Sequence, residues 1–107
     1  GQNEKALEAL ANAARSAPDD LDVQLSFLEL ILASGTTSAE ITRATAALAA
    51  AKKIAPNNPQ TLFFEGHLAR LAGNDGTARI AWTALLKLME PGSGPAKALE
   101  AEINKLN

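Results

Sequence analysis

Two stretches of this chain share one spacing of apolar residues, and each stretch closes at a proline. The first has Ala44, Leu48, Ala51 and Ile54 before Pro56, and the second has Ala78, Trp82, Leu85 and Leu88 before Pro91. A weaker copy at the amino end has Ala6, Leu10 and Ala13 before Pro18. Apolar residues three or four apart form one face of a helix, and proline ends helices. The pattern therefore predicts the second helix of a helix-turn-helix repeat of about 34 residues.

The composition predicts an all-α fold. Apolar residues make up 47% of the 107 residues, and alanine and leucine, which favour helices, dominate that set. No stretch alternates apolar and polar residues with the period of two that strands show. A chain of this length fits one domain.

Local signals predict six helices, at residues 4–16, 21–34, 39–55, 59–72, 77–89 and 94–106. Asp19 or Asp20 caps the second helix, and Gly35 ends it. Thr37 and Glu40 have the spacing of a capping box. Asn58 before Pro59 marks the strongest helix start in the chain, at the boundary 56–59.

Within residues 57–90, two large and two small residues occupy positions that match the pattern of a known repeat. Leu62 takes the large position and Gly66 the small one, while Ala78 and Trp82 open the following helix. These residues resemble a tetratricopeptide repeat, although Glu65 and Ala69 replace the leucine and tyrosine of that pattern. The resemblance implies one solenoid domain over 1–107, with repeats at 20–55 and 57–90, a partial repeat before them and a capping helix at 94–106. The alternative is a compact helical bundle that contains no structural repeat.

Charge and reactive side chains exclude several classes of function. The net charge of -2 and the lack of a basic patch argue against nucleic acid as a partner. With one histidine, no cysteine and no tyrosine, the chain shows no catalytic or metal-binding motif. Asp19, Asp20 and Asp22 lack the glycine and distal glutamate of a calcium loop and suit a helix start. We therefore expect no enzyme activity, no cofactor and no metal.

Phe63, His67 and Arg70 share one face of the helix at 59–72, because they lie at i, i+4 and i+7. In tetratricopeptide arrays the first helix of each pair lines a concave groove. Carried over by register, this implies a peptide-binding groove that consists of Gln60, Phe63, His67 and Arg70, with Asp22, Leu25 and Glu29 from the helix at 21–34. The alternative is that Phe63 is core and that His67 and Arg70 are ordinary surface residues. Phe64, Leu68, Leu71 and Trp82 are expected in the core.

The last half of the chain, from Pro56 to the end, carries a more specific resemblance. Trp82 is followed by Leu85 and Leu86, then by Pro91-Gly92-Ser93 and a short final helix with Leu99 and Ile103. This order is similar to the periplasmic tetratricopeptide domain of the CcmI/CycH family of cytochrome c biogenesis proteins. The resemblance implies a non-enzymatic, chaperone-like role. Proteins of that family hold apocytochrome c by its carboxyl-terminal helix for haem attachment, and haem lyase components are further expected partners.

Location and extent follow as expectations from the same resemblance. It implies a soluble periplasmic domain of a membrane-anchored protein. Because the helix at 4–16 matches only half a repeat, we expect the chain to be a piece of a longer protein. No apolar run approaches the roughly 18 residues of a membrane span, so we expect no membrane contact by this segment. The alternative function is a general scaffold or adaptor for another bacterial protein complex.

Overall fold

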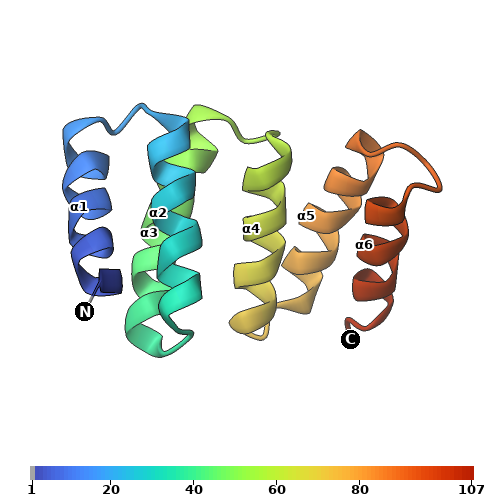
Figure 1. Cartoon of the computed structure of the whole chain (residues 1–107). Helices are drawn as coiled ribbons and strands as arrows, with labels where there is room; N and C mark the ends of the chain where they lie inside the picture. Colours follow the sequence, from blue (N-terminus) through green and yellow to red (C-terminus); the bar gives the residue numbers. More distant parts are fainter. Residues whose placement is uncertain (1) are drawn as a thin grey trace. The chain divides into compact units, whose positions relative to one another are not determined.

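Six helices form the described part of the protein. The computed structural model describes residues 2–107, with the backbone alone for Gln2. The helices, shown in Figure 1, are α1 (Gln2–Ser16), α2 (Leu21–Ser34), α3 (Ser38–Ile54), α4 (Pro59–Leu71), α5 (Asp75–Leu88) and α6 (Gly94–Asn104). No strand occurs among residues 2–107. The predicted all-α class is confirmed.

The helix ends lie within two residues of the predicted ones, because side chains fix them locally. The Asp20 side chain accepts a hydrogen bond from the backbone of α2, and the Ser93 side chain does the same for α6. Asn58 Oδ1 accepts from the first free N–H groups of α4, at 2.9 and 3.2 Å. Thr37 and Glu40 form the predicted capping box of α3. These contacts satisfy N–H groups that have no partner inside a helix.

The turn between α4 and α5 is shorter than predicted. Asn74 Oδ1 accepts from the backbone N of Thr77 at 3.3 Å, and this cap starts α5 at Asp75. Before it, Gly73 has φ +79°, in the left-handed region that glycine adopts without strain. The N–H of Asn74 donates to the carbonyl of Ala69, and that of Gly73 donates to Arg70. This pair of bonds is a Schellman motif, which ends α4.

The chain divides into two compact units, the first ending at Pro56 and the second running over Asn57–Asn107. The division falls in the segment 56–59, where the sequence predicts the strongest boundary. In the first unit α2 contacts both α1 and α3, and in the second α5 contacts both α4 and α6. Each unit is therefore a set of three consecutive helices with the middle helix in contact with both others.

The buried residues of the first unit come mainly from α2 and α3. Leucine and isoleucine from α2 meet a row of small residues on α3, and the set comprises Leu25, Leu28, Ile31, Ala44, Ala47, Leu48 and Ala51. The buried Gln24 side chain donates through Nε2 to the carbonyls of Ala14 and Pro18, at 3.3 and 3.5 Å. This contact joins the end of α1 to α2.

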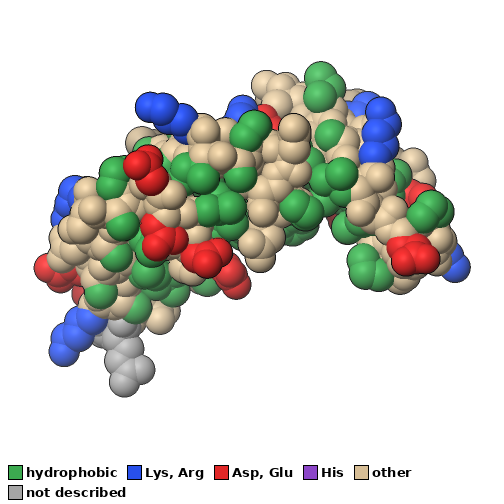
Figure 2. Space-filling model, turned by 90° about the horizontal axis from the view of Figure 1, so that it is seen from above, with side chains coloured by type: hydrophobic (Ala, Val, Ile, Leu, Met, Phe, Trp, Pro, Cys, Tyr) green, Lys and Arg blue, Asp and Glu red, His purple; other side chains and the backbone are tan. Residues whose placement is uncertain are grey.

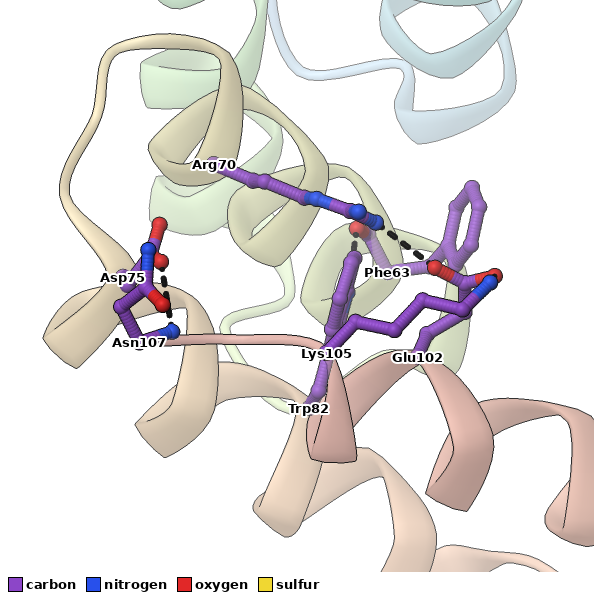
Figure 3. Close-up of polar contacts among 7 residues, drawn as sticks. All are labelled: Phe63, Arg70, Asp75, Trp82, Glu102, Lys105 and Asn107. Atoms are coloured by element: carbon purple, nitrogen blue, oxygen red, sulfur yellow. Dashed lines mark hydrogen bonds and ion pairs between the residues drawn. The ribbon is translucent and has the colours of Figure 1, made fainter.

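The core of the second unit gathers residues from all three of its helices. It comprises Leu62, Ala78, Trp82, Leu85, Leu99 and Leu106, with Ile103 packed at its edge. The predicted burial of Trp82 is confirmed. The final helix contributes Leu99 to this core, and two further bonds hold the end of the chain: Arg79 Nη2 donates to the carbonyl of Leu106 at 3.2 Å, and the N–H of Asn107 donates to Asp75 Oδ2 at 2.8 Å (Figure 3).

Two residues that the sequence places on buried faces are exposed. Leu71 is 37% exposed and Leu88 is 56% exposed, so these two assignments are wrong. Leu71 is the last residue of α4 and Leu88 the last of α5, where the chain turns away from the neighbouring helix. Within the predicted stripe of α4, Leu68 is buried and Phe64 is half-buried.

Over residues 2–107, no helix has both the length and the apolar character needed to cross a bilayer.

Candidate functional site

The second unit holds a pocket of about 390 Å³ formed by three consecutive helices. Residues from α4 and α6 form its walls, and residues from α5 and the turn after it form its floor. The walls include Phe63, His67, Arg70, Pro95, Ala98, Leu99 and Glu102, and the floor includes Trp82, Leu85 and Met89. The lining is mostly apolar, with one basic and one acidic residue among these ten. Pockets of this volume and character accept an apolar side chain or a small ligand.

An aromatic row forms one wall of the pocket. The rings of Phe63 and His67 are nearly parallel, with centroids 6.0 Å apart and an interplanar angle of 4°. Phe63 also lies 6.5 Å from the Trp82 ring, at 22°. Although Phe63 is large and apolar, it is 44% exposed. The alternative that Phe63 belongs to the core is therefore wrong, and its ring is available to a ligand.

Trp82 lies in the floor of the pocket and fixes α4 against α5. It is 2% exposed, and its indole N–H donates to the carbonyl of Phe63 at 3.1 Å (Figure 3). The indole fits there because position 66 is glycine: a Cβ on Gly66 would lie 2.6 Å from Cε2 of Trp82. This close approach explains why a small residue stands at that position of α4.

An ion pair joins the two walls at the edge of the pocket. Arg70 Nη1 on α4 lies 2.7 Å from Glu102 Oε2 on α6, and Lys105 Nζ lies 3.3 Å from Glu102 Oε1 (Figure 3). These hydrogen bonds, with Arg70 the stronger influence, hold the pKa of the Glu102 carboxyl below its usual value. Because the group is exposed, the pair contributes little to stability and remains accessible to an exchange of partners.

His67 favours its neutral form at this site. Burial among apolar groups lowers its pKa, and the positive charge of Arg70 lowers it further. A neutral imidazole keeps the recess uncharged between Phe63 and the ion pair. The surface that a ligand meets is therefore apolar at its centre and charged only at its edge.

The structure brings three of the seven predicted groove residues together in this pocket: Phe63, His67 and Arg70. Gln60 is exposed in the first turn of α4 and does not line it. Asp22 and Glu29 are exposed on α2 of the other unit, whereas Leu25 is 5% exposed and lies among the buried residues.

Sequence reasoning missed the contribution of α6, which it treats only as a cap. The turn between α5 and α6 is short, and short connections make consecutive helices antiparallel neighbours. That spacing was a signal that α6 returns along α5, but the side on which Glu102 would lie depends on packing. The contact between Arg70 and Glu102 therefore needed the structure.

A second recess, of about 750 Å³, lies in the first unit between α1, α2 and α3. Its lining is rich in alanine and includes Gln24 and Phe27, together with the charged residues Glu8, Arg15 and Arg43. None of the predicted residues Asp22, Leu25 and Glu29 lines it. Figure 2 shows that hydrophobic side chains reach the surface in both units, among charged ones.

The described residues hold no group of three or more histidine, cysteine, aspartate or glutamate side chains arranged to bind a metal ion. The pocket of the second unit instead offers an apolar recess with an aromatic wall and one arginine at its edge. Such a surface suits a ligand with an apolar group and a polar neighbour. Comparisons with protein-family models, with curated proteins and with solved structures find no match for this chain.

Proposed function

We propose that this chain is a non-enzymatic protein-binding module built from tetratricopeptide-type helix pairs, and that the α4–α6 pocket holds an apolar side chain from a helix of the partner. The observation that carries the proposal is the exposure of Phe63 at 44% inside a mostly apolar pocket. A large aromatic ring that could be buried, but is presented to solvent beside a recess, is typical of a binding anchor.

An amphipathic helix is the ligand that suits this surface best. Such a helix carries apolar side chains at i, i+3 or i+4, and i+7, which enter a hydrophobic groove in a row. The aromatic wall of Phe63 and His67 runs along α4, and Leu99 and Ala98 face it from α6. The pocket volume of about 390 Å³ has room for side chains rather than for a whole helix.

We further propose apocytochrome c as the partner and the periplasm as the location. The sequence resemblance to the CcmI/CycH family supports this, and some of the residues that carry it contribute to the pocket. Trp82 and Leu85 line the pocket, and Ser93 caps the helix that forms its second wall. In this proposal the pocket holds the carboxyl-terminal helix of the apocytochrome while haem is attached by other proteins.

Calorimetry with a synthetic peptide tests the proposal. A peptide that spans the carboxyl-terminal helix of an apocytochrome c is expected to bind the 107-residue chain with micromolar affinity. Phe63→Ala should weaken binding by about tenfold or more, since a buried aromatic side chain contributes about 1.5–3 kcal/mol. Arg70→Ala should cost less, because ion pairs at an exposed edge are worth about 0–1 kcal/mol.

The matched control is Ile80→Ala. Ile80 is 74% exposed on α5 and does not line the pocket, so its removal deletes a similar apolar surface elsewhere. The Ile80→Ala variant should bind the peptide as tightly as the unaltered chain does. Circular dichroism should show that both Ile80→Ala and Phe63→Ala are folded. No binding at high micromolar concentration, or equal losses for Phe63→Ala and Ile80→Ala, would overturn the proposal.

A general scaffold for another bacterial complex is the second candidate. The recess of about 750 Å³ in the first unit favours it, because that surface contains none of the residues that carry the family resemblance. Under this alternative, amphipathic peptides of unrelated sequence should bind as tightly as the apocytochrome peptide. A preference of tenfold or more for the apocytochrome peptide would exclude it.

A further inference from the structure

Glu102 at the edge of the α4–α6 pocket has two cationic partners rather than one. Arg70 Nη1 approaches one carboxylate oxygen at 2.7 Å, and Lys105 Nζ approaches the other at 3.3 Å. The two partners come from different parts of the unit, since Arg70 is on α4 whereas Lys105 follows directly after α6, which carries Glu102 (Figure 3). Each cation thus uses its own oxygen, so one can leave without displacing the other.

This arrangement makes Arg70 available to a ligand. If Arg70 turns away, Glu102 keeps Lys105 as a partner and no carboxylate is left unpaired. The Arg70 side chain is 40% exposed, so the exchange requires little desolvation. A guanidinium group carries five N–H donors and binds carboxylates with two parallel bonds, which a single bond to Glu102 does not exhaust.

The charge balance at this edge is positive. Two cations, Arg70 and Lys105, share the single carboxylate of Glu102, and burial keeps the neighbouring His67 from adding or removing charge at neutral pH. An acidic group on the ligand therefore meets an excess of one positive charge. A basic group at the same place meets repulsion from it.

We propose that the pocket selects an acidic amphipathic helix, in which an apolar side chain lies against Phe63 and His67 while a glutamate or aspartate one helical turn away takes Arg70 from Glu102. This inference rests on the proposed function of the pocket and adds the chemistry of the partner. The spacing fits, because His67 and Arg70 are three residues apart on α4, which is about 4.5 Å along the axis. A ligand helix that runs parallel to α4 has about that distance between its anchor and the side chain three or four residues later on the same face.

Two peptides that differ at one position test it. Both are acetylated, amidated, 15-residue helical peptides with one phenylalanine anchor, and one carries glutamate four residues after the anchor where the other carries glutamine. The glutamate peptide should bind the 107-residue chain about three- to tenfold more tightly at low salt, as expected for one charge-assisted hydrogen bond at a partly exposed site. The difference should shrink as salt is raised, because exposed charges are screened.

Two protein variants separate ligand binding from a merely structural role of the ion pair. Arg70→Gln should remove the preference for the glutamate peptide. Glu102→Gln should instead raise the affinity for the glutamate peptide, by about two- to fivefold, because Arg70 loses its competing partner. Lys97→Gln, which removes another exposed lysine of α6, is the control for a change in net charge and should have little effect.

The possible outcomes separate the inference about Arg70 from the proposed function of the pocket. Equal losses in Arg70→Gln and Glu102→Gln would mean that the pair only holds α6 in place, and the inference would be wrong. Equal binding of the two peptides, with both still weakened by Phe63→Ala, would overturn the inference and leave the proposed function standing. Failure of both these peptides and the apocytochrome peptide to bind would overturn both proposals.

Discussion

The indole of Trp82 lies against the backbone of Gly66, and its N–H donates to the carbonyl of Phe63 at 3.1 Å. One side chain on α5 thereby fixes both the separation of α4 and α5 and the position of the residue that presents its ring in the pocket. The contact depends on the missing side chain at position 66. It connects the packing of the second unit to the geometry of its candidate site.

Gly66→Ala is expected to destabilise the protein. The new Cβ would lie 2.6 Å from Trp82 Cε2, and the rigid indole must move. Overpacking of this kind costs about 1–3 kcal/mol, which outweighs the gain of about 1 kcal/mol from alanine in a helix. Urea denaturation followed by circular dichroism measures the change. Gly76→Ala in α5 is the control, because its Cβ meets only Asn74 Oδ1 at 4.0 Å, and it should be neutral or stabilising.

Gly73→Ala should lower the free energy of unfolding by about 1–2 kcal/mol, because an L-residue pays that cost at a left-handed backbone angle. The Schellman motif at the end of α4 holds Gly73 at φ +79°. Open space surrounds both this glycine and Gly94, where φ is not positive. Gly94→Ala is thus a matched control for added volume without backbone strain. Equal effects in thermal melts would mean that strain at Gly73 contributes nothing.

Thr61→Val is expected to stabilise the protein. Thr61 is fully buried, and its Oγ1 has no hydrogen-bond partner among the described residues. Valine has nearly the same shape and removes the unsatisfied hydroxyl, which relieves a cost of about 1–3 kcal/mol. Differential scanning calorimetry should show a higher melting temperature. Thr42→Val is the comparison: it deletes an exposed hydroxyl that donates to the carbonyl of Ser38 at 2.8 Å, and it should bring no such gain.

His67 should titrate below the usual histidine value of 6.5. Burial is the main cause of its lowered pKa and Arg70 the second, so Arg70→Gln should raise the midpoint without bringing it to 6.5. The folded state binds this proton less readily than the unfolded chain does. The contribution of His67 to stability is therefore fully present above pH 6.5 and is lost as the pH drops toward the folded pKa. Proton NMR of the ring measures the midpoint, and a value at or above 6.5 would contradict the environment described for His67.

The helix boundaries could be predicted because they depend on neighbours in sequence. Asn58 with Pro59, and Thr37 with Glu40, satisfy free N–H groups within one turn, so no tertiary information is needed to place the starts of α3 and α4. The exposure of Leu88 could not be predicted in this way. Helical period places Leu88 on the buried face, but burial also requires a neighbouring helix that extends far enough to cover it.

Only those residues of the candidate site that lie on α4 could be predicted from the sequence. Phe63, His67 and Arg70 fall on one face by the period of 3.6, and the structure places them in one pocket. Met89 joins them from the end of α5, and Glu102 joins them because α6 packs against α5 on the side that leaves this glutamate near Arg70. That choice depends on how Leu99 and Leu106 enter the core, which no local pattern specifies.

The chain has one tryptophan and one histidine, and both line the same pocket. The intrinsic fluorescence of the unlabelled protein therefore originates from the site itself, and occupancy of the recess over Trp82 can be followed without a dye. A ligand that enters the α4–α6 pocket contacts the fluorophore directly, so its binding can be titrated from this emission alone.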